Sequence, residues 1–282
     1  MEAPGLADRA AREDVAGVPL AIPFGLAIGL AVGMLGGGGS VLAVPVLVYV
    51  LGQTVPEATT ASLVVVAAGA VAGGLSHARA GRVCWRHAGS FTAAALPGIA
   101  LGTLAAEAVS GPLLLAGFAL AMLAAAHATW RKAGERSERQ SEGTWEPGGT
   151  CPPLRLPRDL IAGAAVGLVT GFFGVGGGFL IVPTLAIALA FTMRTAVGTS
   201  LVIITATSLL GLGAHLLAGR SVGVEVTAAM TLACVVGAVA GAALASRIPQ
   251  RALGRGFAGL VVAVAAYLLI SVTLFGGPPG AG

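Results

Sequence analysis

The chain has 282 residues, of which 56% are hydrophobic and 10% charged, and its mean hydropathy is +0.92. Soluble domains carry roughly 25% charged residues, so this composition excludes a soluble globular protein and predicts a multi-pass protein of the plasma membrane. The net charge is +4. The basic residues stand in short groups between apolar blocks, which is typical of topology signals, so we expect the lipid bilayer and no nucleic acid as a partner.

Residues 1–17 form an N-terminal tail of mixed charge. This is not the basic start of a signal peptide, so we expect an uncleaved first span. Eight apolar blocks follow, at about 18–52, 57–78, 87–107, 112–130, 160–191, 196–218, 225–246 and 255–275. Six of them have the ~20 residues that cross a ~30 Å hydrocarbon core, whereas the first and fifth are too long for a simple upright span.

A polar segment over 131–158 divides the blocks into two sets of four. Its mixed charge, prolines and glycines predict a flexible linker. The sequence therefore predicts an all-α polytopic membrane protein with a first membrane repeat at 18–130, a second at 159–275 and a C-terminal tail at 276–282. The cysteines Cys84, Cys151 and Cys234 are scattered, and we expect free thiols.

Both long blocks contain a glycine-rich break, Gly36–Ser40 in the first and Gly174–Gly178 in the fifth, and a proline follows each break. Glycine costs about 1 kcal/mol in a helix relative to alanine, and proline about 3, so each break should unwind or bend its helix. Each long block is then either a broken, tilted crossing or a re-entrant hairpin with the glycines at its tip. Unwound backbone is tolerated in a membrane only where protein covers it or a wet cavity receives it.

The two halves match each other internally. An offset of 138 residues pairs Gly33 with Gly171, and after one inserted residue an offset of 139 pairs Gly98 with Gly237. The further matched residues of the first half are Gly25, Gly29, Gly36, Pro45, Ser62, His77, Gly81, Arg82, Gly102, Gly117 and Phe118. Interrupted blocks at corresponding places in two repeats indicate a transporter with its substrate site at the breaks.

The basic residues can test the orientation of the repeats. If each long block crosses once, the repeats are parallel, and twelve of the sixteen Lys and Arg lie on one side, with Arg194, Arg247, Arg251 and Arg255 on the other. If each long block is a hairpin, the repeats are inverted and the ratio becomes thirteen to three, with Arg9, Arg12 and Arg220 outside. The more basic side should be cytoplasmic in both arrangements, and the counts favour inverted repeats slightly.

Backbone N–H groups at helix starts can replace the hydration shell of an anion, and glycine lets a ligand approach the backbone closely. We therefore predict an anion site with two walls, formed by Gly36, Gly37, Gly38, Gly39 and Ser40 and by Gly174, Gly176, Gly177 and Gly178. The alternative is close helix packing through small residues. Three hydroxyls, those of Ser62, Thr199 and Ser200, could donate to the anion or could only bond their own helices.

His77 and His215 are a matched pair that could relay a proton in coupled transport, although a structural or headgroup role is favoured by the neighbouring Arg79 and Arg220. The spacing of His, Cys, Asp and Glu indicates no metal site and no cofactor. No nucleophile and base stand together in the blocks, so the sequence predicts no enzyme.

The paired Gly-x-x-Gly-x-Gly-Gly-Gly/Ser-x-x-x-x-Pro motifs, each opening a half of four apolar blocks, resemble the TauE/SafE family of membrane permeases over about residues 19–275. The first motif departs with Gly37 in place of Val175 and Ser40 in place of Gly178. The resemblance implies transport of sulfite, organosulfonates or other small sulfur-containing or carboxylate anions, and an eight-span topology. Alternating access between the halves is the leading hypothesis. A passive anion channel, or a membrane-embedded enzyme or scaffold, is the alternative.

Overall fold

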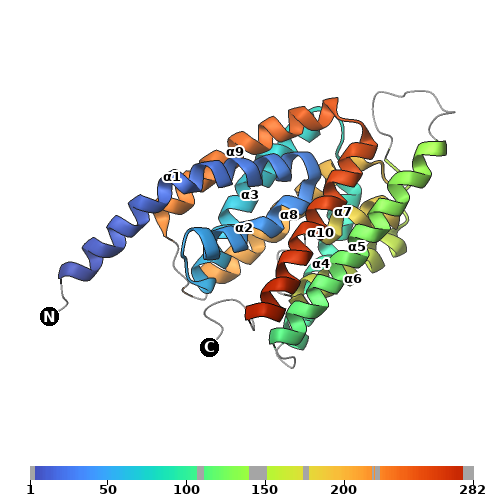
Figure 1. Cartoon of the computed structure of the whole chain (residues 1–282). Coiled ribbons are helices and arrows are strands. Elements are labelled where there is room, and N and C mark those ends of the chain that lie inside the picture. The colour runs from blue at the N-terminus through green and yellow to red at the C-terminus, as the bar shows by residue number, and fades with distance from the viewer. Residues whose placement is uncertain are drawn as a thin grey trace.

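The computed structural model describes residues 4–106, 111–139, 151–173, 178–217, 219 and 223–275, and these contain helices and no strand (Figure 1). The α-helices are α1 (Pro4–Leu35), α2 (Ser40–Pro45), α3 (Val55–Arg79), α4 (Trp85–Ala106), α5 (Gly111–Arg139), α6 (Leu156–Phe173), α7 (Gly178–Ile187), α8 (Met193–Leu217), α9 (Val224–Arg247) and α10 (Gln250–Phe275). The predicted all-α class is confirmed.

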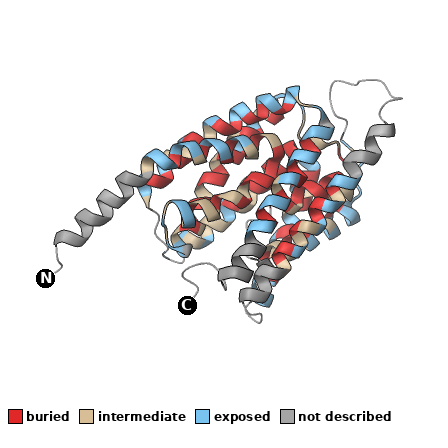
Figure 2. Ribbon diagram, viewed as in Figure 1, coloured by how far each residue is buried: buried red, intermediate tan, exposed pale blue. Residues whose placement is uncertain are grey.

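Five segments of the described chain are long and apolar enough to cross a membrane. They are Val18–Val50, Pro56–Arg79, Trp85–Ala105, Met193–Leu217 and Val224–Arg247. Large apolar side chains also cover the outer surface, for example Leu101, which is 60% exposed, and Ile161, which is 71% exposed. Figure 2 shows buried residues gathered on the inner faces of the helices. An apolar exterior of this kind fits lipid surroundings.

The first long block is a hairpin rather than a straight crossing. Helix α1 ends at Leu35, and Gly36 takes φ +71°, a left-handed conformation that favours glycine. A buried 3₁₀ turn, Gly36–Gly39, follows. A methyl group on Gly39 would lie 2.5 Å from the backbone N of Val32, although seven residues of continuous helix would separate them by about 10 Å. The chain therefore turns back beside α1.

Helices from the two halves of the chain pack in pairs at very short range. Glycines on α1 face backbone carbonyls of α9, so that a methyl group on Gly25 would lie 2.7 Å from the carbonyl oxygen of Met230. Helices α6 and α4 pack in the same way, and a methyl group on Gly163 would lie 2.6 Å from the carbonyl oxygen of Phe91. These small-residue contacts let membrane helices approach closely. Close packing is therefore the role of the glycines along both interfaces, which lie outside the two breaks.

Helices α3 and α8 cross the centre in opposite directions. The start of α3 lies at the end of α8, where Thr60 Oγ1 is 2.9 Å from His215 Nδ1. The end of α3 lies at the start of α8, where a methyl group on Gly198 would be 3.1 Å from the Cβ of His77. The two ends of this central pair therefore mark opposite faces of the protein.

The block formed by α6 and α7 also returns to the side on which it begins. Asp159, in the first turn of α6, contacts His87, whose ring lies 5.0 Å from the ring of Phe191 just after α7. The guanidinium of Arg194 then donates to the carbonyls of Ser246 and Ile248 at the end of α9. A single crossing by α6 and α7 would have placed Arg194 on the opposite face.

The returning hairpin gathers basic residues on one face, which we call the basic face. Its described members are Arg79, Arg82, Arg86, Arg131, Arg155, Arg158, Arg194, Arg247, Arg251 and Arg255. Partial burial and the charge of Arg194 lower the pKa of the Arg82 guanidinium. Arg220 lies outside the described residues. The positive-inside rule predicts that the basic face is cytoplasmic.

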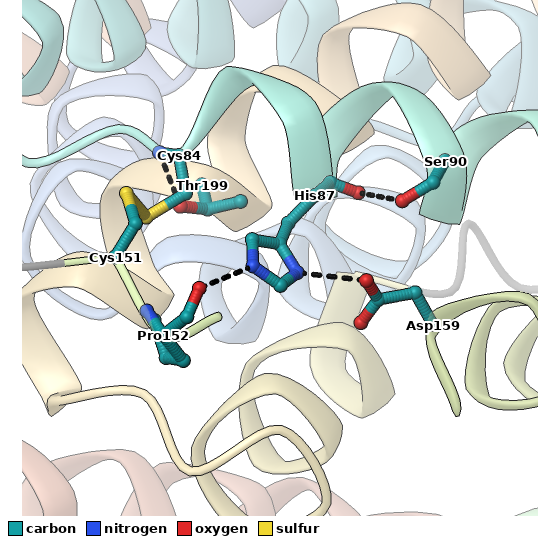
Figure 3. Close-up of polar contacts among 7 residues, drawn as sticks. All are labelled: Cys84, His87, Ser90, Cys151, Pro152, Asp159 and Thr199. Atoms are coloured by element: carbon teal, nitrogen blue, oxygen red, sulfur yellow. Dashed lines mark hydrogen bonds and ion pairs between the residues drawn. A yellow bond between two sulfur atoms is a disulfide. The ribbon is translucent and has the colours of Figure 1, made fainter. Parts of the chain in front are cut away.

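The expectation of free thiols is wrong for two of the three cysteines. Cys84 and Cys151 form a disulfide on the basic face, with their Cα atoms 5.8 Å apart (Figure 3). Cys234 is free and buried. The pair is 67 residues apart in sequence, and no spacing motif marked it. Tertiary packing brings the start of α4 to the end of the polar segment.

The polar segment also differs from a fully flexible linker. Helix α5 continues to Arg139, and the described chain resumes at Cys151, which the disulfide fixes to α4. Similarly, α1 begins at Pro4, within the expected N-terminal tail. Residues 140–150 and the C-terminal tail 276–282 lie outside the described residues.

We expect cysteine labelling to place the basic face in the cytoplasm. Ala252→Cys, on the exposed surface of α10, should react with a membrane-impermeant maleimide only after cells are permeabilised, because the basic side stays inside. Val224→Cys, 76% exposed at the start of α9, is the matched probe of the opposite face and should react in intact cells. Reaction of Ala252→Cys in intact cells would reverse the assignment and place the disulfide in an oxidising compartment.

Breaking the disulfide should lower the thermal stability of the purified protein. Cross-links that close loops of this length stabilise by about 2–4 kcal/mol, which corresponds to a decrease in Tm of roughly 5–10 °C. Cys151→Ser should show the lower Tm both with and without a reductant. The wild type should show this lower Tm only when a reductant is present. Equal Tm values in all four samples would show that the bond does not restrain the fold.

Candidate functional site

A cavity of about 300 Å³ lies between α3, α4, α6 and α8 and reaches the glycine break of the first hairpin. Its polar lining consists of hydroxyls and one imidazole, from Ser40, Thr59, Ser62, Thr103, Thr170, Thr207, Ser208 and His215. Among the described residues that line it there is no Lys, Arg, Asp or Glu. The size suits a small solute, and neutral hydrogen-bonding groups can hold such a solute without a fixed countercharge.

The two interrupted segments meet at the edge of this cavity. A methyl group on Gly178, the first residue of α7, would lie 2.7 Å from Ser40 Oγ and 2.9 Å from Gly37 Cα. The contact is one of backbone against backbone, since Gly37 in turn has no room for a side chain against Gly178. The N-terminus of α7 is thereby placed next to a cavity-lining hydroxyl.

The cavity hydroxyls donate to their own helices. Ser40 Oγ donates to the carbonyl of Gly37 at 2.6 Å, and Ser62 Oγ donates to that of Thr59 at 2.8 Å. Thr207 does the same one turn back, to Ile203 at 3.1 Å. Each hydroxyl has a single hydrogen, so it must rotate away from its carbonyl before it can donate to an anion.

His215 is the titratable group of the cavity lining. Its Nδ1 lies 2.9 Å from Thr60 Oγ1, and that hydroxyl also bonds the carbonyl of Pro56 at 3.0 Å. The carbonyl can only accept, so the single hydroxyl hydrogen of Thr60 belongs to that bond and Nδ1 carries a hydrogen when both bonds are made. The imidazole is therefore oriented by the start of α3.

His77, the sequence partner of His215, has a different position. It is buried, and its Nε2 lies 3.0 Å from the carbonyl oxygen of Gly33. Gly33 is in the last turn of α1, where helix carbonyls lose their intrahelical partners. Donation by Nε2–H satisfies a carbonyl that the break releases, which is a structural role for this histidine.

The remaining predicted residues lie outside the cavity lining. Thr199 accepts a hydrogen bond from the backbone N of Cys84 at 3.1 Å and so supports the disulfide end of α4. Ser200 is fully buried and donates to Val197 at 2.8 Å, beside Gly36. Ser40 lines the cavity, whereas the four glycines that precede it do not. Gly174, Gly176 and Gly177 lie outside the described residues.

Sequence reasoning missed the cavity hydroxyls of α4, α6 and the second half of α8. Thr207 and Ser208 stand four and three positions before Gly211, and His215 stands four positions after it, so these residues share one side of a helix. A small polar stripe at this spacing within an apolar block is a usable signal. Thr103 and Thr170 are isolated in their blocks and become recognisable only through packing.

A second cluster that the sequence did not reveal lies at the basic-face end of α4 and α6. His87 Nδ1 is 2.9 Å from Asp159 Oδ2, and the side chains are 4% and 1% exposed. His87 Nε2 is 3.0 Å from the carbonyl oxygen of Pro152 (Figure 3). In the part of the chain that the structure describes, no group of three or more His, Cys, Asp and Glu could hold a metal ion.

We expect Gly37→Ala to disrupt the meeting of the two breaks. The added methyl group would lie within 2.5 Å of Gly178 Cα, so backbone must move, and overpacking of this kind costs about 1–3 kcal/mol or more. The variant should show a lower Tm in detergent. Gly213→Ala in α8, whose methyl group would meet nothing within 4 Å, is the control and should not lower it. Equal Tm values would contradict the close contact.

Comparison with known proteins identifies the family of this chain. The model of the family described as sulfite exporter TauE/SafE matches residues 21–268. A "Probable membrane transporter protein" of Xylella fastidiosa strain 9a5c is 35% identical over 246 residues, which cover 84% of this chain and 88% of the relative. The protein of the same description from strain Temecula1 is 35% identical over 245 residues, with the same coverage. No solved structure matches this chain. The chain belongs to the TauE/SafE sulfite exporter family of membrane transporters.

Proposed function

We propose that this transporter carries a small anion, such as sulfite or an organosulfonate, by alternating access between two inverted repeats. The observation that carries the proposal is the contact of the two chain interruptions beside a cavity lined by neutral donors. The N-terminus of a helix favours anions, and α7 begins at this contact. The absence of carboxylates from the described lining residues suits an anion rather than a cation.

The packing supports inverted repeats. In the first half α1 packs on α9 of the second, and in the second half α6 packs on α4 of the first, so the same pairs of blocks meet twice. The residues that follow α3 and α8 also match, because Gly81 and Gly219 take φ values of +68° and +72°. Two hairpins that return to their own sides reverse the second repeat relative to the first.

The position of the cavity supports a conformation that is closed at the basic face. Its lining extends to Thr59 and His215, at the opposite ends of the central helices from the basic face. Toward the basic face, the buried Phe91 and then the His87–Asp159 contact fill the α4–α6 interface. Alternating access would open this end and close the other around the two hairpins.

Counterflow in proteoliposomes tests the function. Vesicles loaded with unlabelled sulfite or methanesulfonate should accumulate the labelled anion transiently, because exchange through an alternating site is coupled. A passive channel would show flux without this overshoot and would overturn the transport mechanism. Absence of flux for both anions would refute the substrate class.

The cavity assignment has a separate test. Ser62→Ala removes a lining hydroxyl, and a hydrogen bond to a charged group contributes about 1.5–3 kcal/mol, so half-saturation should need roughly tenfold or more anion. Ser76→Ala, on the same helix but outside the cavity lining, is the matched control and should behave as the wild type. Equal half-saturation in Ser62→Ala would remove this wall from the site.

A further inference from the structure

The buried side chains of His87 and Asp159 approach each other to 2.9 Å, a distance that favours a shared proton. Pro152 offers a carbonyl, which only accepts, so the hydrogen of the 3.0 Å contact belongs to His87 Nε2. The 2.9 Å contact from Nδ1 to Asp159 Oδ2 then needs a second hydrogen. That hydrogen is either on Nδ1, facing a carboxylate, or on the carboxyl oxygen, facing a neutral imidazole.

Loss of this proton would leave a ring-nitrogen lone pair directed at an acceptor inside the protein, either Nδ1 at the carboxylate of Asp159 or, in the other tautomer, Nε2 at the carbonyl of Pro152. Burial of the Asp159 carboxylate without an aligned partner is costly, because neither of its oxygens has a hydrogen-bond partner among the described residues and the 2.9 Å contact of Oδ2 with His87 Nδ1 is that of an ion pair. The contact between α4 and α6 at this end should therefore loosen or admit water when the proton leaves. Proton binding and closure of the basic-face end are linked through one pair.

The groups packed around the pair offer no substitute for the proton. Phe191, from the segment after α7, makes a T-shaped ring contact with His87, and the disulfide beside Pro152 does not titrate. Arg86, Arg155 and Arg158 are near in sequence, but their side chains are exposed. Across the basic face, Arg194 is engaged by two carbonyls of the α9 end.

The corresponding helix contact on the opposite side of the molecule is apolar, so close packing of two helices does not by itself require an ionisable pair. Helices α6 and α4 run in register, with Gly163 at Phe91 and Gly167 at Ala95, so Asp159 meets His87 one turn earlier. The register of α1 on α9 aligns Gly25 with Met230 and Gly29 with Cys234, which puts Ala21 level with Val226. The offsets of 138 and 139 match these two residues to Asp159 and His87. Both are buried and apolar.

A buried ion pair is often no more stable than apolar residues in its place, so stability does not account for the difference. We infer that His87 and Asp159 form the proton-binding site of this transporter, at the gate between the cavity and the basic face. Protonation holds the gate closed, and deprotonation permits it to open. The coupling of this proton to an anion rests on the proposed function, whereas the proton site itself does not.

Proton binding is measured without any substrate. The protein is labelled with ¹⁵N-histidine and placed in lipid nanodiscs, and the His87 signals are identified by their loss in His87→Gln. When the pH is raised and lowered again, these signals should change reversibly in the wild type, because the proton leaves and returns to the pair. In Asp159→Asn the change should disappear, since an amide can bond Nδ1 without a titrating proton. Signals that stay constant in the wild type, or that change equally in Asp159→Asn, would overturn the proton site.

Coupling is measured with the double variant His87→Val/Asp159→Ala, which copies the Val226 and Ala21 pair and should melt within a few degrees of the wild type. With methanesulfonate, an anion that stays ionised, the variant should retain counterflow but lose accumulation driven by a pH gradient. His127→Gln, an exposed histidine of α5, is the control and should keep both. Retained gradient-driven accumulation in the double variant would refute the coupling role. Absence of wild-type methanesulfonate counterflow would refute the proposed substrate and leave the NMR result to decide the proton site.

Discussion

The structure depends on backbone meeting backbone at the two interruptions of the long apolar blocks. Gly37 and Gly178 approach so closely that neither can carry a side chain, and the segments on both sides are fixed by this contact. In a membrane each released N–H and C=O needs a partner, so an interruption is stable only where other protein supplies one. His77 meets this need for the carbonyl of Gly33, and the central helix α3 is thus tied to the break.

The same constraint explains how the halves intertwine. Without a hydrophobic driving force between helices in lipid, association relies on close contact, and glycine and alanine faces supply it. Helix α1 finds its glycine-lined partner in α9, and α6 finds its partner in α4. Neither half can therefore complete its own packing. This arrangement leaves α3 and α8 as the central pair, with the cavity hydroxyls on their inner faces.

Near-symmetry of the backbone makes the chemical differences informative. His77 bonds a backbone carbonyl, whereas its match His215 lines the cavity and bonds a hydroxyl. Asp159 and His87 form a buried ionisable contact in one helix pair, and the matching residues of the other helix pair, Ala21 and Val226, are buried and apolar. Two faces with the same packing but different titratable groups can respond differently to pH. In the inverted arrangement proposed above, such a difference would distinguish the two faces of the transporter and give transport a direction.

The sequence by itself determined the helical class, the membrane setting and the break at Gly36–Gly39, because apolar length, glycine and proline act locally on the backbone. The sequence left open whether each long block crosses the membrane once or turns back. The return of the second long block follows only from the tertiary contact between Phe191 and His87. The sequence also missed the Cys84–Cys151 disulfide, the cavity hydroxyls of α4 and α6, and the His87–Asp159 pair. These features join residues far apart in the chain. Tertiary packing alone decides such contacts, since they depend on the register of helices that share no local signal.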